Sequence, residues 1–92
     1  MIQAIVGAGG KTSLIRKLAE KYHSEGKKVF VTTTTHMFME EDTLLSDDAE
    51  KIIRILEQKG YVHAGIPDGR KIKALSENTY LKVCEKADAV LV

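Results

Sequence analysis

The stretch Met1–Ile15, MIQAIVGAGGKTSLI, decides the fold of this chain. Residues 1–6 form an almost continuous apolar run in which only Gln3 is polar. Such a run is typical of a strand that is buried on both faces of a parallel sheet. The glycines that follow it allow backbone angles that residues with a Cβ resist, so consecutive N–H groups can turn towards an anion. The stretch therefore predicts a strand, a phosphate-binding loop and a helix.

The loop reads GAGGKT over residues 7–12 and has the form G-x-x-G-K-T. It is shorter than the common phosphate loop G-x-x-x-x-G-K-[ST], which would need a glycine in place of Ile5. Lys11 can bring positive charge to the outer phosphates, Thr12 can ligate Mg²⁺, and the helix directs its positive end to the same place. The alternative is a glycine-rich turn with a solvated lysine, but Lys-Thr at the start of a helix favours phosphate binding. The residues predicted to bind the nucleotide are Gly7, Ala8, Gly9, Gly10, Lys11, Thr12 and Ser13.

Length and composition bound the class of protein. The 92 residues allow one domain at most, and a content of 43% hydrophobic and 29% charged residues indicates a folded, soluble chain. The net charge of +1 supplies no field that would favour nucleic acid or an anionic membrane. No apolar run approaches the roughly 20 residues of a membrane span. We therefore expect a cytoplasmic protein without a nucleic-acid or membrane partner.

A second polar segment follows the next expected strand, residues 28–35, KVFVTTTT. In a doubly wound sheet the carboxyl ends of the strands open onto the ligand crevice, so residues 33–36 are expected beside the loop. Hydroxyls of Thr34 and Thr35, together with Thr12, are candidate ligands of Mg²⁺ or of its bound water, and His36 is the candidate catalytic residue at the terminal phosphate. The alternative is that threonines simply favour strands and that His36 lies in solvent. The sequence leaves both readings open.

The rest of the chain alternates helix and strand patterns, as in an α/β fold. The expected elements are a helix that Gly26 ends, with Leu14, Ile15, Leu18, Ala19 and Tyr22 on its apolar face; a loop over 37–39; a helix capped by Asp47 with Glu50 and ended by Lys59-Gly60; a strand over 61–66 stopped by Pro67-Asp68-Gly69; a loop or short strand over 71–75; a helix capped by Ser76; and a buried central strand over 88–92. The fold class is therefore a three-layer α/β fold of the P-loop NTPase kind with a mostly parallel sheet.

The apolar strand at the end of the chain bears on domain organisation. A domain is not expected to end on its most hydrophobic strand without a covering helix. In phosphate-loop folds a second apolar strand ends in an acidic residue that holds Mg²⁺, which here would follow Val92. We therefore expect residues 1–92 to be the N-terminal part of a single nucleotide-binding P-loop domain that continues beyond residue 92.

Three motifs, VGAGGKTSLI, VTTTTH and ADAVLV, resemble those of the YqeC-like family, whose members carry a GAGGKT loop, a TTTTH segment and a VLVEADG stretch. The resemblance implies a protein that binds ATP or GTP with Mg²⁺ and acts as an accessory factor in the maturation of selenium-dependent molybdenum hydroxylases. Its implied partner is a molybdenum hydroxylase or its maturation machinery. Residues 7 and 9–12 match the loop, and Thr32–Thr35 with His36 match the threonine segment. Since the family's acidic residues lie beyond Val92, we expect hydrolysis only from a longer protein and no activity from these residues alone.

Two other function classes remain beside this one. The short loop also resembles the ATP site of Mur-type ligases, which activate a carboxylate as an acyl phosphate and join it to an amine. Those enzymes typically place the loop after a preceding domain, whereas here it begins at Gly7. The third class is a non-catalytic module whose nucleotide state is read by a partner. Steady phosphate release, release only with acid and amine, or binding without release would distinguish the three classes.

Overall fold

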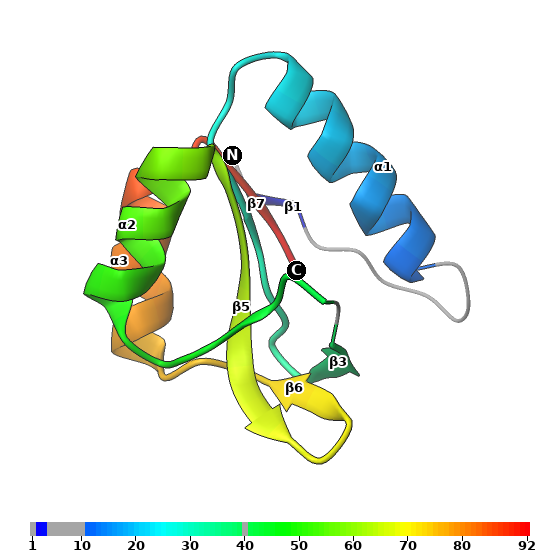
Figure 1. Ribbon diagram of the computed structural model, residues 1–92, viewed down its shortest axis with the longest axis vertical. Coiled ribbons are helices and arrows are strands. Elements are labelled where there is room, and N and C mark those ends of the chain that lie inside the picture. The colour runs from blue at the N-terminus through cyan, green and yellow to red at the C-terminus, as the bar shows by residue number, and fades with distance from the viewer. Residues whose placement is uncertain (1, 4–10, 40) are drawn as a thin grey trace.

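Three helices pack on both faces of a seven-stranded mixed sheet in the part of the chain that the computed structural model describes, residues 2–3, 11–39 and 41–92 (Figure 1). The elements are β1 (Ile2–Gln3), α1 (Lys11–Ser24), β2 (Val29–Val31), β3 (His36–Phe38), β4 (Leu44–Leu45), α2 (Ala49–Lys59), β5 (Tyr61–Asp68), β6 (Lys71–Lys73), α3 (Glu77–Lys86) and β7 (Ala89–Leu91). The predicted α/β class is confirmed. No helix within these described ranges has the length and apolarity needed to cross a membrane.

The strand order is β1-β7-β2-β5-β6-β3, and β4 also pairs with β5. Neighbours β1, β7, β2 and β5 run parallel, and β4 runs parallel to β5. The β5–β6 and β6–β3 pairs are antiparallel. The sheet is therefore mixed, with a parallel part that contains β7 between β1 and β2, as expected for a buried apolar strand.

Alternation along the strands divides the core into two layers. Phe30 faces α2 and α3, whereas Val29 and Val31 face α1. Figure 1 shows the same arrangement, with α1 on one side of the sheet and α2 and α3 on the other. The buried cluster on the α2 and α3 side comprises Phe30, Ile52, Leu56, Val62, Ala64, Leu75, Val83 and Val90. The cluster under α1 comprises Ile15, Ala19, Val29, Val31 and Leu91.

The helix ends show where local signals succeed and where they fail. Gly60 ends α2 in the left-handed conformation, φ 73°, as its position after Lys59 predicts. The predicted cap Asp47 is wrong by one residue, because Asp48 accepts the N–H groups of Glu50 and Lys51. Asp47 instead accepts from the backbone N–H of Ser76, at 2.9 Å, and so ties the start of α2 to that of α3.

Two further expectations about α1 and α3 are wrong in part. Ser76 precedes α3 as predicted, but its side chain makes no capping hydrogen bond, since its hydroxyl donates to Asp47 and Thr79. Leu14, assigned to the apolar face of α1, is 46% exposed. The buried face of this helix is therefore narrower than its apolar pattern, and it centres on Ile15 and Ala19.

Strand boundaries differ from expectation around the hairpin of β5 and β6. The strand expected over 28–35 ends at Val31, and the expected loop over 37–39 is largely strand, because β3 pairs with β6. β5 continues through Pro67 to Asp68 instead of stopping at Ile66. Gly69, φ 66°, then provides the left-handed turn. Lys71–Lys73 is the short strand that the sequence left open.

We expect Gly65→Ala to lower the free energy of unfolding by about 1–3 kcal/mol, because it overpacks the core. A Cβ on Gly65 would lie 2.6 Å from Cδ1 and 2.7 Å from Cβ of Ile72, so the paired strands would have to shift. Urea unfolding followed by circular dichroism measures the change. Arg70→Ala, at an exposed position of the adjacent turn, is the control and should stay within about 0.5 kcal/mol of the wild type. Equal stability of the two variants would contradict the packing argument.

Candidate functional site

The candidate site is the edge of the sheet where β1, β7 and β2 end. These strands are adjacent, parallel and in register, with Gln3 opposite Leu91 and Leu91 opposite Val31. Their carboxyl ends therefore lie at one level, and the segments that follow them leave the sheet at a common edge. In open α/β sheets this edge is where ligands bind.

The predicted phosphate loop belongs to this edge through its two flanks. It starts after β1, which ends at Gln3, and it leads into α1, which begins at Lys11. The loop residues Gly7, Ala8, Gly9 and Gly10 lie outside the described residues, as do the side chains of Lys11, Thr12 and Ser13. The assignment of these seven residues to nucleotide binding stays a prediction.

The threonines after β2 differ in their surroundings. Thr32 is fully buried, and its hydroxyl donates to the carbonyl oxygen of Ala64 at 2.8 Å. Thr33 accepts at Oγ1 a hydrogen bond from the backbone N–H of Thr35, at 3.1 Å. Thr34 and Thr35 are exposed. Thr32 and Thr33 therefore shape the bend that presents Thr34 and Thr35, the two predicted metal ligands, to solvent.

His36, the predicted catalytic residue, opens β3 and forms a pair with Asp68. Its Nε2 lies 2.9 Å from Oδ2 of Asp68, and both side chains are about half exposed. Asp68 was missed by sequence reasoning because Pro67-Asp68-Gly69 reads as a turn signal. Only the antiparallel pairing of β3 and β5 with β6 brings the two residues together.

His63 is the histidine that the structure buries. As expected it is a strand residue, in β5, and it is only 2% exposed. Its Nε2 lies 3.3 Å from Sδ of Met37 and its Nδ1 lies 3.0 Å from Oγ1 of Thr43. A thioether can only accept, so Nε2 carries the proton and Nδ1 accepts from the threonine hydroxyl. This ring therefore joins β5 to two points of the chain between β2 and β4.

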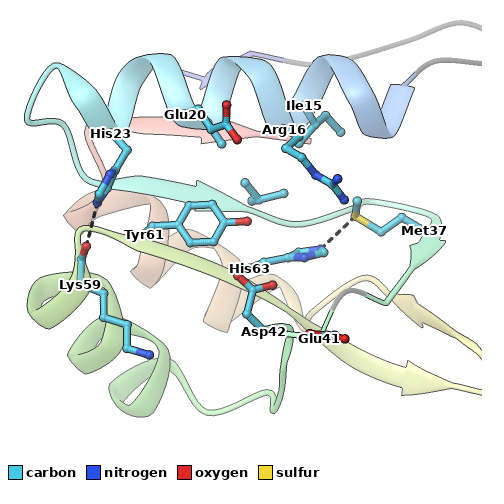
Figure 2. A pocket seen from close by; sticks show the side chains of 12 residues that line it. Ile15, Arg16, Glu20, His23, Met37, Glu41, Asp42, Lys59, Tyr61 and His63 are labelled. Atoms are coloured by element: carbon cyan, nitrogen blue, oxygen red, sulfur yellow. Dashed lines mark hydrogen bonds between the residues drawn. The ribbon is translucent and has the colours of Figure 1, made fainter.

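A cavity of about 770 Å³ lies between α1 and the sheet (Figure 2). Tyr61 and His63 form part of its floor, and Arg16 and Glu20 extend from α1 above them. The cavity reaches the carboxyl end of β2, since Val31 lines it. Its full lining is Ile15, Arg16, Ala19, Glu20, His23, Val31, Met37, Glu41, Asp42, Lys59, Tyr61 and His63. The sequence did not predict it because these residues come from separate segments.

Cys84 and metal-binding clusters offer no second site in the described part of the chain. Burial raises the pKa of the Cys84 thiol, although a hydrogen bond with Tyr80 acts in the opposite direction. Burial, and then Cys84, raise the pKa of Tyr80. A thiol with a raised pKa is a poor nucleophile near neutral pH. No three His, Cys, Asp or Glu side chains gather into a metal site in the described ranges.

Comparisons with known proteins place the chain beside one family. The sequence model described as "YqeC protein" matches residues 3–92. The uncharacterized protein YqeC of Escherichia coli (strain K12) is 61% identical over 36 residues. That alignment covers 39% of this chain and 14% of the length of that relative. No solved structure matches.

Proposed function

Because this chain belongs to the YqeC family, we propose that it binds a nucleoside triphosphate, ATP or GTP, together with Mg²⁺ at the edge where β1, β7 and β2 end. One observation carries the proposal: the register of these three parallel strands makes the loop before α1 and the bend after β2 leave the sheet at the same edge. Two segments with phosphate-binding and hydroxyl chemistry thus share one ligand crevice.

The loop supplies the phosphate contacts in this proposal. Glycines at 7, 9 and 10 let backbone N–H groups converge on an anion, and the start of α1 adds the positive end of the helix dipole. Lys11 is the first residue of that helix, so it neutralises the outer phosphates, and Thr12 ligates Mg²⁺. The remaining nucleotide contacts come from Ala8 and Ser13.

The bend after β2 supplies the groups that sense the terminal phosphate. Thr34 and Thr35 are exposed, and the hydrogen bond from the Thr35 N–H to Thr33 orients the bend. Their hydroxyls bind Mg²⁺, its water or the γ-phosphate. His36 acts on the terminal phosphate in a longer protein that hydrolyses the nucleotide, and Asp68 orients its ring.

The cellular role in this proposal is that of a cytoplasmic accessory factor for selenium-dependent molybdenum hydroxylases. It rests on the likeness of the GAGGKT, TTTTH and ADAVLV motifs to those of the family. The partner is the hydroxylase or its maturation machinery. Deleting the gene should abolish selenium-dependent hydroxylase activity and leave molybdenum enzymes without selenium active. Unchanged hydroxylase activity would contradict the role while leaving nucleotide binding open to its own test.

We expect fluorescent analogues of ATP or GTP to bind in the presence of Mg²⁺, and removal of Mg²⁺ with EDTA to weaken that binding about tenfold or more, because the metal bridges phosphate and hydroxyl oxygens. Titration followed by fluorescence anisotropy measures both affinities. The double variant Thr34→Val with Thr35→Val should lose most of the Mg²⁺ effect. Ser24→Ala, at the far end of α1, is the control and should keep it. Absence of binding at millimolar nucleotide would overturn the proposed function.

A further inference from the structure

The chain between β2 and β4, residues 32–43, is held at three points by two consecutive residues of β5. We call it the threonine connection. At its start, the Thr32 hydroxyl donates to the carbonyl oxygen of Ala64 at 2.8 Å. In its middle and at its end, Sδ of Met37 lies 3.3 Å from Nε2 of His63 and Oγ1 of Thr43 lies 3.0 Å from Nδ1.

The β5 side of these contacts is rigidly placed. His63 lies opposite Val31 in the parallel pair of β5 and β2, and its side chain is 2% exposed. Figure 2 shows its ring in the floor of the cavity, with the dashed contact to Met37. Because both ring nitrogens are engaged and the ring is buried, small movements of the connection would break a hydrogen bond in a water-poor place.

Thr34 and Thr35 lie between two of the three held points. Thr32 fixes the chain on one side of them and Met37 on the other, so five peptide units span the exposed bend. The positions of the two exposed hydroxyls therefore depend on the contacts to β5, although neither threonine touches β5 itself in any printed bond of this network.

Packing alone does not require a histidine at this position. The neighbouring residues under α1 are apolar, among them Val31 and Ile15, and a leucine would fill buried volume without needing partners. Replacing a buried hydrogen-bonded group by an apolar one of similar size can be nearly neutral for stability. The two directed hydrogen bonds of His63 therefore add position more than they add stability.

We propose that His63 is a positioning residue that fixes the threonine connection so that Thr34 and Thr35 meet the γ-phosphate of the bound nucleotide. This inference rests on the proposed function and adds how triphosphate is told from diphosphate. The discrimination is measured as the ratio of the diphosphate Kd to the triphosphate Kd. His63 touches no phosphate, so its loss should change this ratio and leave the loop contacts common to both nucleotides intact.

The test is His63→Leu in the protein with Mg²⁺, titrated with ATP and ADP and with GTP and GDP. We expect the triphosphate Kd to rise about tenfold and the diphosphate Kd to stay within about twofold, since the lost hydrogen bonds act only through the connection. His63→Gln, whose amide nitrogen can donate to Met37, should restore part of the ratio. A purely structural role would weaken both nucleotides equally, or lower the melting temperature without changing the ratio.

Thr43→Val is a second, milder variant that removes one of the two bonds at a half-buried position. It should lower the ratio in the same direction as His63→Leu, and it decides the question if His63→Leu does not fold. An unchanged ratio in folded His63→Leu or in Thr43→Val overturns the inference while wild-type binding upholds the proposed function. Failure of the wild type to bind any of the four nucleotides overturns both.

Discussion

Lys11→Ala is expected to lower the affinity for nucleoside triphosphate about 10–100-fold while the protein still folds. A hydrogen bond to a charged group contributes about 1.5–3 kcal/mol, and each 1.4 kcal/mol is a factor of ten in affinity. Lys11 opens α1, and alanine is the best helix former, so the helix should persist. Nucleotide titration measures the loss, and far-ultraviolet circular dichroism checks the fold.

The matched control is Lys17→Ala, which removes the same charge from an exposed position further along the same helix. It should change the affinity less than about twofold, because charge effects at a surface are screened beyond about 8–10 Å. An equal loss in both variants would point to overall charge instead of a phosphate contact. Unchanged affinity in Lys11→Ala would reject the phosphate role of the loop.

Phe30→Ala is expected to lower the free energy of unfolding by about 3–5 kcal/mol, through lost burial and the cavity left behind. Phe30 is fully buried in the middle of β2, with Val62 of β5 on one side and Val90 of β7 on the other. Its ring lies 6.2 Å from that of Tyr80 on α3. Because domains of this size are stable by only about 5–14 kcal/mol, the loss would remove a large share of the total.

Urea unfolding measures this loss, and two variants bracket it. Phe30→Leu keeps most of the volume and should cost less than about 1.5 kcal/mol. Leu81→Ala removes an apolar side chain that is 51% exposed and should stay within about 0.5 kcal/mol. A cost for Phe30→Ala no larger than that of Leu81→Ala would mean that the cluster around Phe30 is not the main core.

Prediction of the site from sequence reached its parts but not their assembly. The motif likeness to the YqeC family is confirmed by the match over residues 3–92. The sequence also places Thr34, Thr35 and His36 directly after a buried strand, which the structure bears out for β2. That these residues and the loop bind a nucleotide stays a prediction, since residues 7–10 and the side chains of 11–13 lie outside the described residues. The partners of His36 and His63 had no signal in the sequence.

What the sequence determines by itself is local: the apolar spacing that makes α2, the glycine that ends it at position 60, and the short buried strand over 89–91. Each depends on neighbours within a few residues, so periodicity and turn chemistry suffice to predict it. What only the tertiary structure decided is the strand order, with β7 between β1 and β2, and the contacts of His36 with Asp68 and of His63 with Met37 and Thr43. These join residues 20–32 positions apart or more, and they arise from how whole strands pair, which no local pattern encodes.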